Sequence, residues 1–181
     1  MSILLFAESE NNKLKRNAAE IASYGAALAG KLNKDCVAVS FNADNAQELG
    51  QFGVLKVFNV TNVPQQFDAH VYANVLTHYI KSLGATHIIL GSSADAKFLA
   101  PLVAANTNAA YVPNVVALPH EQQPLTVRRT VFTNKAFAST TLTAEVNIIG
   151  VGNNAFGTVE QAVDCVVELS LIHISGPTRP C

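Results

Sequence analysis

A glycine and two serines, Gly91, Ser92 and Ser93, directly follow the apolar run THIIL and open into a helical pattern. Phosphate often binds at such a place in α/β proteins, because the first N–H groups of the helix point at the anion. A phosphate cradle needs several exposed backbone N–H groups, whereas this loop has a single glycine. Asp95 would also repel an anion there. We therefore favour a capped helix start, with Ser93 or Asp95 as the N-cap, over a phosphate site.

Nucleophilic catalysis and metal binding find no support in the pattern. Ser92 and Ser93 lie between a strand and a helix, but no G-x-S-x-G motif surrounds them. His87 lies in the apolar run before them, and we interpret it as a packed residue bonded to backbone. His70 and His78 are eight residues apart in one helical segment, a spacing that places them on its polar face. With no Walker A or G-x-G-x-x-G motif present either, we assign no catalytic, cofactor-binding or metal-ligating residue.

The composition and the cysteines narrow the class of protein. The chain of 181 residues is 49% hydrophobic and 14% charged, with a net charge of −1, which excludes a disordered chain. This balance gives no electrostatic case for nucleic acid or membrane as a partner. Cys36, Cys165 and Cys181 share no short spacing, so they predict neither a zinc site nor a redox motif. Because the start has no signal or transit pattern and no run is long enough to span a bilayer, we expect a cytoplasmic protein.

Strands and helices alternate over the first 110 or so residues, and the strands are apolar throughout. This combination predicts a parallel sheet with helices on both faces. The expected strands are residues 2–9, 35–41, 54–60 and 86–91, and the expected helices are residues 18–32, 43–53 (short), 68–83 and the segment after Ser93. Pro101 leaves two possibilities for the last helix, which either begins near Ala100 or bends after an earlier start at Asp95.

The second half has strand-like segments with no helix between them, namely YVPNVVAL, LTVRRTVF, AFASTTLT and EVNIIGVG. We expect them to extend the same sheet or to form a small antiparallel sheet beside it. FGTVEQAVDCVVEL is expected to be a final strand. In the segment LTVRRTVF, Arg128 and Arg129 are adjacent and must point to opposite faces of their strand, so at least one should meet solvent, a partner or a buried acid.

The order of these segments resembles the α subunit of electron transfer flavoprotein. ILLFAESENNKLKRNAAEIASYGAALAG is similar to the opening of that family, a strand ending in Ala-Glu, a Lys-Leu-Lys turn and a long Ala-rich helix. HIILGSSADAKFLAPLVAANTNAAYVPNVVAL resembles the family's loop, LAP helix and VVAL strand, and VRRTVFTNKAFASTTLTAEVNIIGVGNNAFG resembles its paired strands. The resemblance covers about residues 3–169 and rests on the order of the motifs.

The resemblance implies a three-layer, Rossmann-like domain of the adenine-nucleotide α-hydrolase-like type with added C-terminal strands. It also implies an electron carrier and not an enzyme: a heterodimer with a β subunit whose FAD passes electrons from dehydrogenases of fatty-acid β-oxidation to a membrane quinone oxidoreductase. In that family a second, C-terminal domain of the α subunit holds most of the FAD, and AMP belongs to the β subunit. We therefore expect no cofactor on this part of the protein, and we expect contacts with the β subunit at Arg128, Arg129 and Asn134.

The expected domain covers residues 1–170, and residues 171–181 are expected to be a non-native tail resembling translated adapter sequence. A natural flexible C-terminus remains the alternative for that tail. A second interpretation of the whole chain is a universal-stress-like protein that binds ATP or AMP near residues 7–10 and 91–93, at the strand ends. Its only late glycine-rich candidate, GVGNNAFG at Gly150–Gly157, precedes no helical pattern. A hydrolytic α/β enzyme would lack both a nucleophile context and a base.

Overall fold

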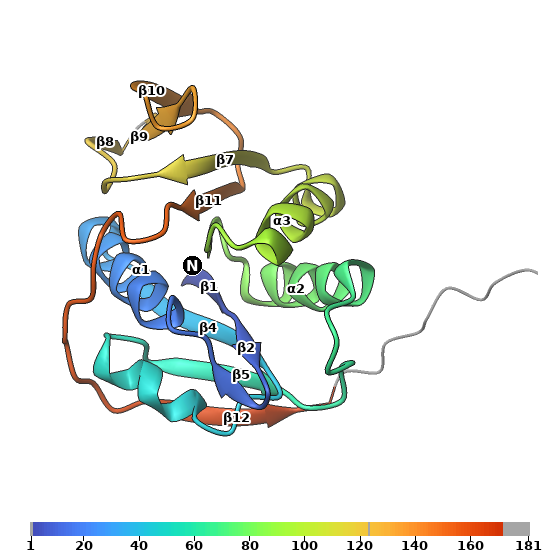
Figure 1. Cartoon of the computed structure of the whole chain (residues 1–181). Coiled ribbons are helices and arrows are strands. Elements are labelled where there is room, and N and C mark those ends of the chain that lie inside the picture. Colours follow the sequence, from blue (N-terminus) through green and yellow to red (C-terminus); the bar gives the residue numbers. More distant parts are fainter. Residues whose placement is uncertain (1, 123, 172–181) are drawn as a thin grey trace, which may run out of the picture.

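A ten-stranded sheet forms the centre of the fold, and helices cover both of its faces (Figure 1). The structure is a computed structural model and describes residues 2–122 and 124–171. Cys181 and all of the expected tail except Leu171 lie outside the described residues. The sheet confirms the predicted α/β class with three layers.

Parallel strands make up most of the sheet, and their order in space differs from their order in the chain. The parallel strands are β1 (Ser2–Ala7), β4 (Asp35–Phe41), β5 (Lys56–Val60), β6 (His87–Leu90), β7 (Ala110–Val115), β11 (Asn147–Val151) and β12 (Val166–Ser170). Across the sheet they run in the order β7, β11, β6, β1, β4, β5, β12. β11 thus inserts between β6 and β7, and β12 pairs with β5 at the far edge. The carboxyl ends of β1, β6 and β11 consequently lie side by side.

The helices divide between the two faces as the apolar pattern predicts (Figure 1). α1 (Ala18–Leu32) and the 3-10 helix η1 (Ala46–Gln51) cover one face, and α2 (Ala69–Leu83) and α3 (Ala94–Thr107) cover the other. The N-cap of α2 is Asp68, which accepts two backbone N–H bonds, and its C-cap is Gly84 in the left-handed region. α3 begins at Ala94 and continues through Pro101, so an earlier start than Ala100 is correct.

Each face of the sheet carries its own apolar core. Ile3, Leu5 and Tyr24 are fully buried on the α1 face, and Leu4 and Leu76 are fully buried on the α2 face. Burial of one such side chain contributes roughly 1.5–3 kcal/mol to the stability of the fold. Because both faces are covered, the strands are apolar without alternation.

An antiparallel hairpin extends the sheet at one end. It consists of β9 (Leu125–Val131) and β10 (Ala136–Leu142), with the short β8 (Glu121–Gln122) beside β9. β9 joins β7 through a single pair, Val115 and Arg129. The hairpin therefore projects from the body of the domain (Figure 1). These strands extend the main sheet, which decides between the two possibilities that the sequence left open.

Two features differ from the sequence-based expectation. The polar turn after β1 contains a small hairpin of β2 (Ser9–Glu10) and β3 (Lys13–Leu14), which the pattern did not reveal. Asn11 and Asn12 supply the two left-handed residues that such a tight turn requires. The final strand is also shorter than expected, because the regular strand covers only Val166–Ser170, at the end of the predicted segment and one residue beyond it. Among the described residues, no helix is both long and apolar enough to cross a membrane.

Candidate functional site

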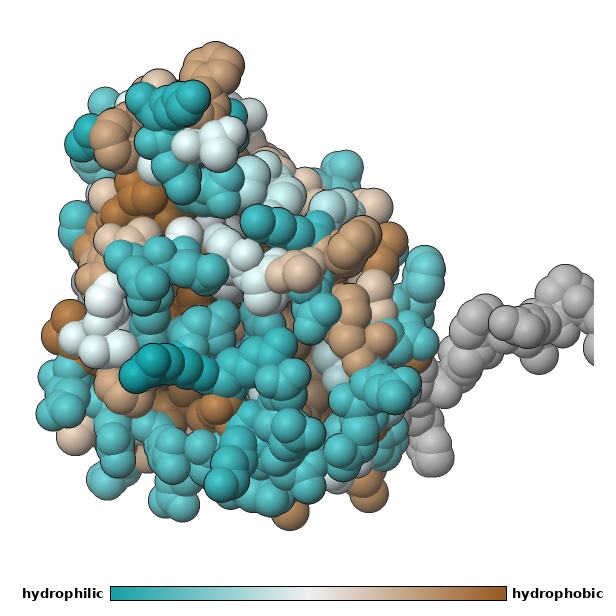
Figure 2. All heavy atoms as spheres, in the orientation of Figure 1, coloured by the Kyte–Doolittle hydropathy of each residue, from teal (hydrophilic) through white to brown (hydrophobic). Residues whose placement is uncertain are grey.

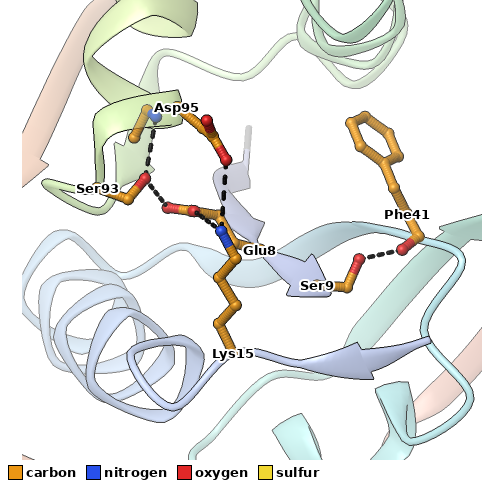
Figure 3. Close-up of polar contacts among 7 residues, drawn as sticks. Glu8, Ser9, Lys15, Phe41, Ser93 and Asp95 are labelled. Carbon is orange, nitrogen blue, oxygen red and sulfur yellow. Dashed lines mark hydrogen bonds and ion pairs between the residues drawn. The ribbon is translucent and has the colours of Figure 1, made fainter. Parts of the chain in front are cut away.

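Ser93 and Glu8 join the carboxyl ends of β6 and β1 (Figure 3). The Ser93 hydroxyl accepts a hydrogen bond from the Ala96 N–H at 3.0 Å, so it is the N-cap of α3, as predicted. The same hydroxyl donates to the Glu8 carboxylate at 2.8 Å. The Glu8 carboxylate is almost fully buried. Ser93 is thus fully engaged in capping and in stabilising a buried charge.

Lys15 lies between Glu8 and Asp95 and pairs with both carboxylates (Figure 3). Its Nζ is 3.3 Å from Glu8 Oε2 and 3.4 Å from Asp95 Oδ2. Burial would lower the pKa of Lys15, but the charges and hydrogen bonds of Glu8 and Asp95 outweigh it and raise the pKa above its ordinary value. Asp95 is therefore held in a charge cluster, a role that its position in the sequence did not reveal.

A cavity of about 420 Å³ opens beside this cluster. Glu8, Glu10 and Asp95 line it together with Lys15 and Tyr72. Three carboxylates against one ammonium group give the lining a formal charge of −2, which disfavours phosphate at these strand ends. The geometry therefore agrees with the prediction of a capped helix in place of a phosphate site.

The serine and histidine candidates do not come together into a catalytic arrangement. Ser92 donates to the carbonyl of Val151, and Ser93 is engaged as described above. His70 and His78 are exposed on α2, as predicted. The described residues include no group of three or more His, Cys, Asp or Glu that could hold a metal ion.

His87, which is half-buried, and Cys36, which is buried, are titratable groups near the opposite ends of the strands. The His87 Nδ1 lies 2.9 Å from Thr86 Oγ1 and 3.5 Å from Lys34 Nζ, so its contacts are with side chains and the expected bond to backbone is wrong. Burial and the charge of Lys34 lower the pKa of His87 to about 4. Cys36 is a free thiol whose pKa burial raises to about 12. Neither group has the surroundings of a reactive residue.

The predicted interface residues lie on the projecting hairpin. Arg128 is exposed, and its guanidinium lies 4.1 Å from the centre of the Phe137 ring. Arg129 is half-buried and donates from Nε to Thr140 Oγ1 at 3.0 Å. The ion pairs within residues 2–122 and 124–171 include neither arginine. Both remain available to an acidic partner.

The hairpin tip displays an aromatic side chain that the sequence pattern did not reveal as exposed. Phe132, Thr133 and Asn134 are three consecutive residues in the left-handed region, and the Phe132 side chain is 80% exposed. This conformation is uncommon for a bulky residue and is often a sign of function. Asn134 is exposed and lines a hollow of about 360 Å³ with Lys97. The sequence signal that could have revealed this exposed side chain is a phenylalanine, Phe132, next to the polar residues of a turn.

Charge and apolar surface occur together on this hairpin. Arg128, Arg129 and Lys135 lie in a segment that has no acidic residue between positions 122 and 144. Phe132 and Phe137 are both exposed, and the hairpin projects at the top of the molecule, where apolar and polar residues alternate (Figure 2). A basic, aromatic projection of this kind suits an acidic protein surface with an apolar pocket.

Comparison with known proteins identifies the domain. The family model described as the electron transfer flavoprotein domain matches residues 3–168. A search of curated proteins finds no match.

Proposed function

The chain belongs to the electron transfer flavoprotein domain family, a family of electron carriers, and on that premise we propose that it is the N-terminal domain of an α subunit. In this proposal it pairs with a β subunit to form a heterodimer. The heterodimer carries electrons on FAD from dehydrogenases of fatty-acid β-oxidation to a quinone oxidoreductase. The domain itself acts as a scaffold and performs no catalytic step.

The projecting hairpin is the observation that carries this proposal. Two exposed phenylalanines cost solvation free energy unless a partner covers them, and exposed aromatic and arginine side chains are typical anchors of protein interfaces. Arg128 stacks on Phe137, and this contact favours one arrangement of the two exposed side chains before binding. We propose that Arg128, Arg129 and Asn134, together with Phe132, contact the β subunit.

The described residues do not fit the pyrophosphate of FAD or the phosphates of ATP. At the strand ends, Glu8, Glu10 and Asp95 outnumber Lys15 in the cavity lining. In the glycine-rich loop after β11, the carboxylate of Glu20 already accepts the backbone N–H bonds that a phosphate would need. We therefore propose that the flavin is held by a separate domain and by the β subunit. The same contacts disfavour the universal-stress-like interpretation.

Co-expression with a β subunit tests the pairing. We expect the two chains to co-elute in size-exclusion chromatography. Phe132→Ala should weaken the complex by at least about 30-fold, the effect of removing a buried aromatic anchor. Leu169→Ala is the matched control, because Leu169 is 71% exposed on β12, at the opposite edge of the sheet.

A second variant tests what the charge of Arg128 contributes to association with the β subunit. Arg128→Glu should slow association and reduce its dependence on salt, since rim charges act mainly on the association rate. A chain that stays monomeric beside the β subunit would overturn the proposal. Equal affinities of the Phe132→Ala and Leu169→Ala variants would move the interface away from the hairpin.

A further inference from the structure

The loop after β11, Gly152–Thr158, forms a concave array of backbone N–H groups. Asn154 and Gly157 have left-handed backbone conformations, with φ values of 54° and 81°. The N–H groups of Asn154, Phe156 and Gly157 all donate to the two oxygens of one carboxylate. Successive N–H groups in such a conformation form a nest that binds anions.

The carboxylate of Glu20 occupies this nest. Asn154 N–H donates to Glu20 Oε2 at 2.9 Å, and the N–H groups of Phe156 and Gly157 donate to Oε1 at 2.9 and 3.0 Å. Glu20 is 6% exposed and lies in the first turn of α1, where the helix dipole also favours a negative charge. The ion pairs of residues 2–122 and 124–171 do not include Glu20. Backbone dipoles and not a cation therefore hold this charge.

The loop is also tied to α1 at a second point. The Val159 N–H donates to the hydroxyl of Ser23 at 2.9 Å. Ser23 is one turn further along α1 than Glu20, and it is almost fully buried. The two side chains thus hold the same loop, one as an anion and the other as a neutral acceptor.

A cavity of about 560 Å³ leads from the surface to this place. Lys15, Arg16, Ser93 and Thr158 line it, and Glu20 itself contributes to the lining. The cavity is large enough for a phosphate group, and Arg16 would lie beside an anion that entered it. Positively charged side chains and hydrogen-bond donors are therefore present for an external oxyanion, but the carboxylate of Glu20 takes the innermost position.

We propose that the loop after β11 is an anion-binding site for phosphate-like oxyanions, and that Glu20 is its built-in anion and closes it to such ligands. Truncation of the Glu20 side chain, as in Glu20→Ala, opens a phosphate site in this domain. This inference concerns a site remote from the hairpin and does not depend on pairing with a β subunit.

Three variants and one probe test the proposal. Glu20→Ala removes the carboxylate, Glu20→Gln keeps its volume without its charge, and Ser23→Ala removes the neutral tie to the same loop. The probe is inorganic phosphate, compared with sodium chloride at equal ionic strength because phosphate also stabilises proteins nonspecifically. Unfolding is followed by circular dichroism, and binding is measured by calorimetry.

Glu20→Ala should unfold more readily than the wild type in chloride and recover in phosphate along a saturating curve. At phosphate concentrations ten times its dissociation constant, its unfolding equilibrium constant should fall about ten-fold. Ser23→Ala, Glu20→Gln and the wild type should show only the small, unsaturable effect of salt. In Glu20→Gln the side chain still fills the nest.

Two results would overturn the proposal. One is equal phosphate stabilisation of Glu20→Ala and Ser23→Ala, and the other is phosphate binding by the wild type as tight as that of Glu20→Ala. If Glu20→Ala does not fold in chloride, its refolding yield in phosphate becomes the measurement. A yield that is independent of phosphate would then refute the site.

Discussion

His87 makes the stability of this domain dependent on pH in a way that can be calculated. His87 is the first residue of β6, and its ring is in contact with the polar groups of Lys34 and Thr86. Because burial and the Lys34 charge lower its pKa from 6.5 to about 4, the unfolded chain binds a proton more readily than the folded one between those values. The stabilising contribution is therefore complete above pH 6.5 and is lost as the pH falls toward 4.

The size of the effect follows from the same values. A shift from 6.5 to about 4 corresponds to at most about 3.4 kcal/mol at 1.36 kcal/mol for each pKa unit. The ring retains contact with water, which screens the interaction, so we expect about 1–2 kcal/mol. This is a measurable fraction of the total stability of a small domain.

Urea unfolding at pH 7.0 and 4.5 measures this contribution. Between pH 7.0 and 4.5, the free energy of unfolding of the wild type should fall by about 1–2 kcal/mol more than that of His87→Gln, because glutamine does not titrate. His78→Gln is the control, since His78 is exposed on α2 and its replacement should leave the pH dependence unchanged. Lys34→Met should reduce the pH dependence by removing the neighbouring charge. Identical pH profiles of the wild type and His87→Gln would refute the reasoning.

Two further predictions concern the buried polar groups. Lys15→Met leaves the buried Glu8 carboxylate without its cation and should lower the free energy of unfolding in urea by about 2 kcal/mol, which is less than the cost for a fully buried pair because Lys15 is partly exposed. The double variant with Glu8→Gln should recover part of the loss, and an unchanged stability of Lys15→Met would contradict the charge cluster. In a variant that carries Cys165→Ser and Cys181→Ser, Cys36 should react with a thiol reagent at pH 8 only as fast as the domain unfolds, because the Cys36 thiol is buried and its pKa is raised to about 12. Rapid labelling of Cys36 in the folded protein would contradict this prediction.

Local sequence signals were sufficient for most of the elements. The strand Asp35–Phe41 has the predicted bounds, and the helix Ala69–Leu83 begins one residue after its predicted start, because apolar periodicity and capping residues act within a few positions of the chain. The two strand-like runs that form β9 and β10 were also predicted as strands with a turn between them, and the structure adds that they pair as an antiparallel hairpin. The family resemblance, which rested on the order of such segments, was confirmed.

Contacts between distant positions were decided by the tertiary structure alone. The insertion of β11 between β6 and β7 and the pairing of β12 with β5 depend on long-range strand partners, which periodicity does not specify. Lys15 pairs with Asp95 from 80 residues away and also with Glu8, so the charge around Asp95 could not be predicted from its own position in the sequence.

The loop at Gly150–Gly157 shows most clearly the difference between what the sequence indicates and what only the tertiary structure decides. The sequence offered it only as a glycine-rich candidate for nucleotide binding with no helical pattern after it, whereas the structure shows left-handed conformations at Asn154 and Gly157. Only the packing of that loop on α1 brings Glu20 to its N–H groups across more than 130 residues of chain. The sequence by itself determined the glycines and asparagines of this loop, and the tertiary structure decided that its N–H groups meet the charge of Glu20.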